Sequence, residues 1–475
     1  MNHQSRKLFK RFISITALSF SLLCCFQVNA KVKSVSATEV DYFTDHGFSN
    51  TVQPGKDSGE YYKGVTYVSY QGPLEDAYIA AYNHKTKTWT GPVKAGVSIM
   101  GKDPKHKIDN HGKPALVVDN EGYIHLIFGG HGGLPEHGKN PLGNTHYGKQ
   151  IHVVSKNPED ISSWEVLDNI PPFGTYSQFI KMDNGNIYYL YRHGAHESNW
   201  VYQLSTDNAR TFEPPVSILK TKRRTDTPGV ADAWYPSFAR GQGDDIITTY
   251  NYHVCKHGSL KHDGERQNAY YMVMDTKDHT WRNVKGEKLK TPVTKEHADE
   301  MTLVKNTGDL WTVRGVTRLD NKGNPHLTFY VGEGKGLHHG GPKVPAHYRW
   351  AGTQWTGGSN NGLPVSTGEL LASSSTKVSL LLANNQKGKK EKKKKSEVVW
   401  WDSTDGGQSF TKGETVISSK TSYKISSFIR NAHPDARFVI AEKRKGKDKN
   451  YSYMTLYGDK GPIKRLKAEA EHSNK

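Results

Sequence analysis

The chain has 475 residues, with 65 Lys and Arg against 47 Asp and Glu, which gives a formal net charge of +18. This length suits one large β domain or two to three domains of ordinary size. After residue 30 no apolar run is long enough to cross a membrane as a helix, so the composition argues against a membrane protein.

Residues 1–30 have the pattern of a secretory signal peptide. A basic start leads into the apolar stretch FISITALSFSLLCCF, which is too short for a membrane span, and the small-residue sequence VNA ends the segment. We therefore expect a secreted protein, extracellular or periplasmic, with a single domain over residues 31–475. The segment holds four basic and no acidic residues, so the exported chain would carry +14.

Charge and cysteine content describe the expected environment. Two of the three cysteines lie in the signal segment, so Cys255 is left without a partner for a disulfide within the chain. For an exported protein of charge +14, a sulfated or carboxylated polysaccharide is a better partner than nucleic acid. Part of the charge lies in the lysine-rich run KGKKEKKKKS, residues 387–396, which we interpret as a solvated loop.

The rest of the chain has a β pattern. Short runs of β-branched and aromatic residues alternate with turns rich in Gly, Asn and Asp. A strand–turn–strand unit recurs with the turns DNEG (119–122), MDNG (182–185), GQGD (241–244) and NTGD (306–309), after an earlier copy at YYKG (61–64). The glycines that mark these turns are spaced by 58, 63, 58 and 65 residues. We expect later copies at the lysine-rich run and at HPDA (433–436).

Two further segments, STDNARTF (205–212) and STDGGQSF (403–410), resemble the Asp-box hairpin turn of sialidase-type propellers. The first copy has Ala209 where glycine is usual. About seven units of roughly 60 residues predict an all-β fold, a seven-bladed β-propeller with four strands in each blade. A long β-sandwich is the alternative.

Hairpin symmetry brings four polar residues together. Residues pair symmetrically about a hairpin turn, so the turn DNEG places His111 and His131 at the same end of one hairpin. The turn MDNG places Tyr176 beside Arg192 in the same way. Equivalent hairpin ends of a propeller lie on one face around the channel, so we expect these four side chains to converge.

The following hairpins add to this face. The turn GQGD places Tyr235 opposite Tyr250, and the turn NTGD places His297 opposite Arg318. We take four further residues as candidates for substrate binding: Tyr235, Arg240, His193 and Arg318.

His, Tyr and Arg without a pair of carboxylates argue against ordinary glycoside hydrolysis, which needs two acidic groups. They suit β-elimination from a uronic acid, which removes the C5 proton and expels the oxygen at C4. An Arg or a protonated His must neutralise the negative charge that develops on the carboxylate. Neutral His is a natural base, and Tyr can donate to the leaving oxygen or, with its pKa lowered by cations, accept the proton.

Three motifs resemble those of the ulvan lyases of polysaccharide lyase family 25: DNHGKPALVVDNEGYIHLIFGGHGG, GTYSQFIKMDNGNIYYLYRHG and AWYPSFARG. The resemblance covers essentially the whole chain after the signal segment. It implies a seven-bladed propeller that cuts ulvan, a sulfated rhamnose–uronate polymer of green algae. It also implies endolytic elimination that leaves an unsaturated uronate at the new non-reducing end.

The resemblance further implies roles for the four convergent residues. His111 and Tyr176 would be acid/base residues, and Arg192, helped by His131, would neutralise the carboxylate. Which of His111 and Tyr176 takes the C5 proton stays open.

The segment NYHVCKHGSLKHDG (251–264) predicts a metal site with four candidate ligands: His253, Cys255, His257 and His262. Residues two apart in a strand face the same side, and thiolate with imidazole suits zinc. A distant histidine such as His279 could complete the set. The resemblance supports a structural zinc, and we expect no organic cofactor; an unliganded cysteine beside surface histidines is the alternative.

Two other functions stay open. One is a sialidase-like hydrolase, although the Arg-Ile-Pro start typical of those enzymes is absent from this sequence. The other is a propeller that only binds sulfated glycans. In each case we expect a monomer that binds neither nucleic acid nor membrane.

Overall fold

A computed structural model describes residues 38–48, 59–100, 109–257, 264–334, 341–385, 395–443 and 451–471. These ranges belong to one compact unit, Thr38–Lys475. The expected signal segment, His262 and the lysine-rich run up to residue 394 lie outside the described residues. Within the described ranges, no helix is both long and apolar enough to span a membrane.

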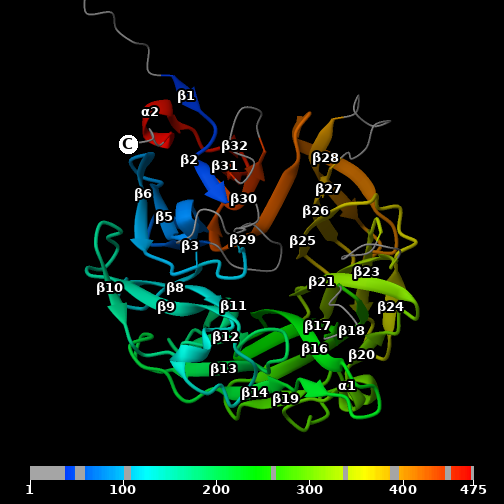
Figure 1. Cartoon of the computed structure of the whole chain (residues 1–475). Helices are drawn as coiled ribbons and strands as arrows, with labels where there is room; N and C mark the ends of the chain where they lie inside the picture. Colours follow the sequence, from blue (N-terminus) through cyan, green and yellow to red (C-terminus); the bar gives the residue numbers. More distant parts are fainter. Residues whose placement is uncertain are drawn as a thin grey trace, which may run out of the picture. The chain divides into compact units, whose positions relative to one another are not determined.

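Strands dominate the described residues, and groups of four antiparallel strands define the blades (Figure 1). Blade 1 contains β3 (Gly59–Tyr62), β4 (Val65–Gln71), β5 (Ala77–Asn83) and β6 (Thr88–Gly96). Blade 2 contains β7 (Ala115–Val118), β8 (Ile124–His131), β9 (Tyr147–Ser155) and β10 (Trp164–Leu167). Blade 3 contains β11 (Thr175–Lys181), β12 (Ile187–Arg192), β13 (Trp200–Ser205) and β14 (Val216–Leu219). Blade 4 contains β16 (Val230–Arg240), β17 (Asp245–Lys256), β18 (Arg266–Asp275) and β19 (Thr280–Arg282).

Three more blades follow. Blade 5 contains β21 (Leu310–Leu319), β22 (Pro325–Glu333), β23 (Val344–Trp350) and β24 (Trp355–Gly358). Blade 6 contains β25 (Thr367–Ala372), β26 (Val378–Asn384), β27 (Ser396–Ser403) and β28 (Thr411–Ser419). Blade 7 contains β29 (Tyr423–His433), β30 (Ala436–Glu442), β31 (Tyr451–Gly458) and, from the start of the chain, β2 (Thr44–Phe48).

Short elements complete the described structure. The short strands are β1 (Glu39–Val40), β15 (Lys222–Arg223), β20 (Leu303–Lys305), β32 (Gly461–Pro462) and β33 (Arg465–Leu466). The helices are α1 (Lys295–Met301) and α2 (Lys467–Ala470), with the 3-10 turns η1 (Pro73–Glu75) and η2 (Pro135–His137).

The first strands of the blades form a closed ring. Each contacts the first strand of the next blade, from β3 to β29, and β29 then pairs in parallel with β3 through Arg430 and Glu60. Strand β2 pairs with β31, so a strand from the start of the chain completes the last blade. The seven-bladed β-propeller predicted from the sequence repeats is confirmed.

Hydrophobic clusters lie between neighbouring blades. One of them joins blades 3 and 4, where Trp200 Nε1 also donates a hydrogen bond to the carbonyl of Trp234 at 2.8 Å. A strand in the middle of a blade is therefore covered on both faces, which explains why the sequence of β12, IYYLYR, is buried throughout.

Most of the predicted turns are correct. DNEG, MDNG and GQGD connect the first two strands of blades 2, 3 and 4, and HPDA does so in blade 7. Two predictions are wrong. NTGD lies between β20 and β21, and the turn of blade 5 is DNKG (320–323). The lysine-rich run lies between β26 and β27, whereas residues 373–377 connect β25 to β26.

In the correct turns of blades 2 and 5 an aspartate accepts two backbone hydrogen bonds, whereas in NTGD the Asn306 side chain accepts one, from the Gly308 N–H at 2.9 Å. The Asp119 carboxylate accepts hydrogen bonds from the backbone N–H groups of Glu121 and Tyr123, at 2.9 and 2.8 Å. Asp320 accepts in the same way from Lys322 and Asn324. The aspartate at the first position of each turn thus holds the loop closed, which is the usual role of Asp in such turns.

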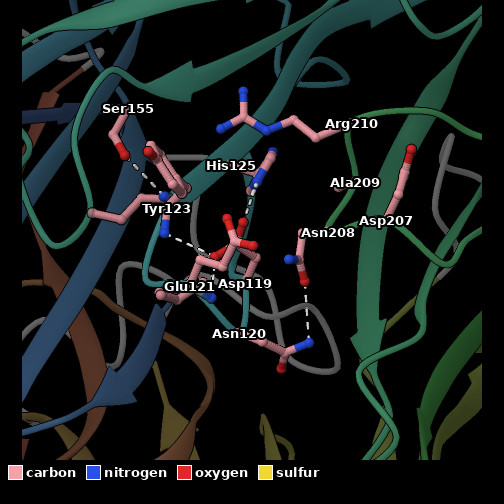
Figure 2. A network of polar contacts seen from close by, with 12 residues as sticks. Asp119, Asn120, Glu121, Tyr123, His125, Ser155, Asp207, Asn208, Ala209 and Arg210 are labelled. Atoms are coloured by element: carbon pink, nitrogen blue, oxygen red, sulfur yellow. Dashed lines mark hydrogen bonds and ion pairs between the residues drawn. The ribbon is translucent and has the colours of Figure 1, made fainter.

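These two aspartates also begin buried histidine networks. Asp119 lies 3.4 Å from Nε2 of His125 (Figure 2), and Nδ1 of His125 lies 3.0 Å from Nε2 of His152. In blade 5, Asp320, His326 and His347 repeat the arrangement.

Each network lies against an Asp-box of the next blade. Asn169, bonded to His152, donates to the carbonyl of Ala209, and Gly407 packs against the ring of His347. Ala209 adopts a φ of 58°, so it takes the left-handed conformation that glycine usually supplies in this turn. Figure 2 shows the first Asp-box beside the Asp119 turn, where Asn120 donates to Asn208 at 3.1 Å.

We predict that acid destabilises the protein through these histidines. Burial lowers the pKa of His152 and of His347 to about 3, from an ordinary value of 6.5. The unfolded chain therefore binds protons that the folded chain does not, so stability is complete above pH 6.5 and falls as the pH drops toward about 3. Each such histidine contributes about 1.4 kcal/mol per pH unit in this window. Thermal unfolding across the window measures the effect, and His347→Gln should flatten the slope; an unchanged slope in that variant would contradict the assignment.

Candidate active site

Tyr176 and Arg192 come from the first hairpin of blade 3. Thr175 pairs with Arg192, and a bulge between Thr175 and Gln178 leaves Tyr176 with a φ of 61°. The Arg192 guanidinium is buried, with 1% of the residue exposed, and its Cζ lies 4.9 Å from the centre of the Tyr176 ring. The bulge therefore aims the tyrosine at the arginine, as hairpin symmetry predicted.

His111 and His131 are held by one carboxylate, that of Asp109. Nδ1 of His131 lies 2.5 Å from Asp109 Oδ2, and Nδ1 of His111 bonds to Asp109 Oδ1. The two imidazoles stack with centroids 3.7 Å apart and planes inclined by 8°. The His111 ring lies 5.3 Å from that of Tyr176, so blades 2 and 3 meet here. Sequence reasoning missed Asp109, although it stands two residues before His111.

The shared carboxylate fixes the chemistry of the imidazoles. Burial by itself would raise the pKa of Asp109. The hydrogen bonds from His111 and His131 have the larger, opposite effect, so the pKa lies below its ordinary value and Asp109 is ionised. Burial lowers the pKa of His111 to about 4 despite the opposing effect of Asp109. A neutral imidazole that donates from Nδ1 to a carboxylate keeps its lone pair on Nε2. His111 is therefore arranged as a base.

Tyr235, from β16 of blade 4, also joins this group. Its ring lies 5.7 Å from that of Tyr176 and 5.8 Å from Cζ of Arg192. The residue opposite is Asn251, not Tyr250, because the paired residues Arg240 and Ile246 enclose one residue more than the four-letter turn. The predicted pairing was thus wrong by one position.

Arg266 is a site residue that sequence reasoning missed. Its Cζ lies 3.7 Å from the centre of the Tyr235 ring. It begins β18, the third strand of blade 4, and hairpin symmetry about the first turn of a blade reaches only the first two strands.

The two tyrosines differ in acidity. Burial raises the pKa of Tyr235, but Arg266 and Arg192 together lower it to below its ordinary value of 10.0. Burial and the neighbouring Tyr235 raise the pKa of Tyr176 far above that value, and Arg192 opposes this only in part. Tyr176 therefore stays protonated, while Tyr235 is the tyrosine that ionises more readily.

Of the other substrate-binding candidates, His193 directly follows Arg192, whereas the two arginines lie away from the site. Nδ1 of His193 lies 3.0 Å from the side chain of Asn140. Arg240 pairs with Asp183, and Arg318 pairs with Glu369 at 3.0 Å. Both arginines stand beside the turns of their hairpins, at the end opposite to the catalytic candidates.

His297 lies on α1 and is not opposite Arg318, which pairs with His326 in the β21–β22 hairpin. This prediction was wrong because it used the turn NTGD.

A candidate metal centre lies beside the catalytic histidines. Donor atoms of His196, His253 and Cys255 all lie within 4.8 Å of one another, and the Cys255 sulfur is 3.9 Å from Nδ1 of His196. Nδ1 of His253 donates to the carbonyl of Glu265 at 2.7 Å, which leaves the Nε2 lone pair to bind a metal. Two imidazoles and a thiolate are a donor set that zinc prefers.

This centre differs from the predicted ligand set. His196 follows β12 in blade 3, some 57 residues before His253, so local spacing could not reveal it. His257 lies instead 3.3 Å from a Glu197 carboxylate oxygen, and His279 bonds to the Tyr188 hydroxyl. The His196 ring is also 6.4 Å from that of His131, so the metal candidate and the catalytic candidates are neighbours.

Comparison with known proteins gives consistent matches. Residues 65–360 match the model of a family described as BNR repeat-containing. The chain is 51% identical to an ulvan lyase of Nonlabens ulvanivorans, covering 98% of this chain and 99% of that one. It is 47% identical to an ulvan lyase of Alteromonas sp. (strain LOR), covering 91% and 90%.

Solved structures agree with these relatives. A PL25 ulvan lyase matches with a TM-score of 0.86 and 47% identity, over 92% of this chain and all of that one. That family has also been solved bound to -[GlcA(1-4)Rha3S]-, again with a TM-score of 0.86.

We predict that Tyr235 ionises below the ordinary tyrosine pKa of 10.0, because Arg266 and Arg192 stabilise its phenolate. Ultraviolet difference absorbance during a pH titration measures tyrosinate directly. Tyr235→Phe should remove the earliest transition, and Arg266→Met should move it to higher pH. Tyr176→Phe is the matched control and should leave that transition in place; its disappearance there would reassign the acidic tyrosine.

Proposed function

Because the chain belongs to the ulvan lyases of polysaccharide lyase family 25, we propose that it depolymerises ulvan by β-elimination. The protein is a polysaccharide lyase. The proposal extends to a secreted enzyme that cuts endolytically and leaves an unsaturated uronate at the new non-reducing end. It rests above all on Arg192, a buried cation held between two tyrosines and next to a histidine pair.

Arg192 supplies the charge that the reaction needs. The C5 proton of a uronate becomes acidic only when the adjacent carboxylate is neutralised. Nη2 of Arg192 is buried and has no hydrogen-bond partner within the described residues. A buried guanidinium nitrogen without a partner is costly, and a substrate carboxylate bound at Nη2 would supply the missing acceptor.

The proton transfers follow from the pKa shifts of His111 and Tyr176. We assign the base to Nε2 of His111, which is neutral and carries a lone pair. It takes the C5 proton, the electron pair forms the C4–C5 double bond, and the C4–oxygen bond breaks. Tyr176, which stays protonated, donates to the departing oxygen. His131 and Asp109 hold the base, and Tyr235 lies on the side of the two arginines.

The surrounding cations favour a sulfated substrate. Arg266 lies over the ring of Tyr235. Burial lowers the pKa of Lys343, and the nearby charge of Arg266 lowers it further. In the described part of the chain, neither forms an ion pair with a carboxylate. Cations without a counter-charge attract a polyanion, so this side of the site suits a sulfate next to the uronate.

We further propose that His196, His253 and Cys255 hold a structural zinc ion. Zinc would cross-link the loop after β12 to strand β17, and thus tie blade 3 to blade 4 behind His131. No step of the elimination passes through it, because Arg192 already supplies the positive charge beside the substrate.

Turnover should depend on Arg192. Arg192→Ala should reduce kcat by on the order of 10²–10³-fold, because the charge on the carboxylate is no longer neutralised. The assay is the ultraviolet absorbance of the new conjugated double bond during incubation with ulvan, together with the early fall in viscosity that endolytic cutting produces. Arg240→Ala, which removes a cation at the turn end, is the matched control and should retain activity. Near-normal turnover by Arg192→Ala would refute the assignment.

Metal content tests the zinc proposal separately. Elemental analysis of the purified protein should find about one zinc ion per chain. Cys255→Ser and His196→Ala should lose it and lower Tm more than they lower activity, since the ion's role is structural. His257→Ala should keep it. Zinc loss from His257→Ala, with retention in His196→Ala, would restore the ligand set predicted from the sequence.

A further inference from the structure

We propose that Glu75 is a positioning residue for the elimination: from blade 1 it holds Asp109, and through Asp109 the two catalytic imidazoles of blade 2. This inference rests on the proposed function, since it concerns the same site. Glu75 has no contact with the substrate in the proposed mechanism. It acts on the residue that orients the base.

The hydrogen bond that carries the inference is short, and the carboxylate that accepts it belongs to a buried residue. Oε1 of Glu75 accepts from the backbone N–H of Asp109 at 2.7 Å. The residue is 3% exposed, and Oε2 has no hydrogen-bond partner among the described residues. Burying a carboxyl group that makes one hydrogen bond lowers the stability of the fold. The position of Glu75 is therefore explained better by its bond to Asp109 than by a contribution to stability.

Asp109 needs such an anchor because it does not lie on a strand. Residues 109–114 precede β7, and His111 is in a turn. Two residues of blade 1 bond to the backbone of Asp109. Glu75 accepts a hydrogen bond from its N–H, and Nε2 of Gln71 donates one to its carbonyl at 3.1 Å. The position of Asp109, whose carboxylate bonds to both imidazoles, is therefore set by the neighbouring blade.

The backbone conformation at Glu75 also supports the inference. Leu74 and Glu75 have φ values of 57° and 61° inside the turn η1. Two consecutive residues with side chains in the left-handed region are unfavourable, and such strain collects at functional sites. Here it turns the Glu75 side chain toward Asp109, whereas the next residue, Asp76, binds Lys94 and Ser98.

Charge on Glu75 is not required for this role. Burial raises the pKa of Glu75 to about 7, although the bond from the Asp109 N–H opposes the shift. The neutral acid is thus well populated at neutral pH, and an amide oxygen can accept the same N–H. Glu75→Gln should preserve the anchor, whereas Glu75→Asp, one methylene shorter, and Glu75→Ala should lose it.

Steady-state kinetics on ulvan with these three variants of the full chain test the inference. We expect Glu75→Ala and Glu75→Asp to lower kcat roughly 10- to 100-fold with a smaller change in KM, as misplaced catalytic groups do. Glu75→Gln should stay within a few-fold of the parent enzyme. Glu369→Ala, an equally buried carboxylate in blade 6 bound to Arg318, should lower Tm without this selective fall in kcat.

The outcomes are distinct. Should Glu75→Asp keep the parent kcat, or should Glu75→Gln fall as far as Glu75→Asp, the positioning role is wrong; the aspartate variant decides the matter if Glu75→Ala does not fold. The unsubstituted enzyme tests the proposed function independently, because an absence of unsaturated product from it would overturn the lyase assignment whatever the variants do.

Discussion

Closure of the ring between β29 and β3 is the constraint on which the site depends. Arg430 of blade 7 donates to Glu60 of blade 1, to the Phe179 carbonyl of blade 3 and to the Leu116 carbonyl of blade 2. Glu60 in turn accepts the Val118 N–H at 2.9 Å. One arginine thus joins the first strands of blades 7, 1, 2 and 3, and β11 of blade 3 in turn contacts β16 of blade 4. The side chains of blades 2, 3 and 4 can therefore form one site.

Charge in that site is distributed unevenly, and the chemistry follows from this. Asp109 is the carboxylate bonded to the catalytic candidates, and two imidazoles engage its oxygens. Arg192 and Arg266 lie against tyrosine rings, with which cations interact favourably when they are desolvated. His111 is therefore the proton acceptor of the site, and the two guanidinium groups are where an anion would bind. Ordinary glycoside hydrolysis uses two carboxyl groups at the bond that is cut, and this arrangement of one carboxylate, two imidazoles and two guanidinium groups differs from it.

Sequence reasoning reached those features that depend on short-range symmetry. Turn glycines revealed the blades, and hairpin arithmetic placed His111 with His131 and Tyr176 with Arg192. It failed where a contact joins separate elements: Asp109 and Glu75 meet across two blades, His196 reaches Cys255 from another blade, and Arg266 lies on a third strand. NTGD was mistaken for the turn of blade 5 because it has the composition of a turn, although it connects β20 to β21; DNKG, which matches DNEG at three of its four positions, connects β21 to β22.

The two halves of the site are positioned by different physical means. Tyr176 and Arg266 belong to strands, and irregular backbone aims them: Tyr176 has a φ of 61° at a bulge, and Asn268, two residues after Arg266, has the same φ. Left-handed strand residues with side chains are unfavourable, so the surrounding sheet must enforce them. Asp109 and His111 lie on the loop before β7, and Asp109 is fixed there by Glu75 and Gln71 of the preceding blade; His131 ends strand β8 and bonds to the same Asp109. The arginine and tyrosine half should therefore tolerate changes in blade 1 that the histidine half does not, because only the latter takes its position from that blade.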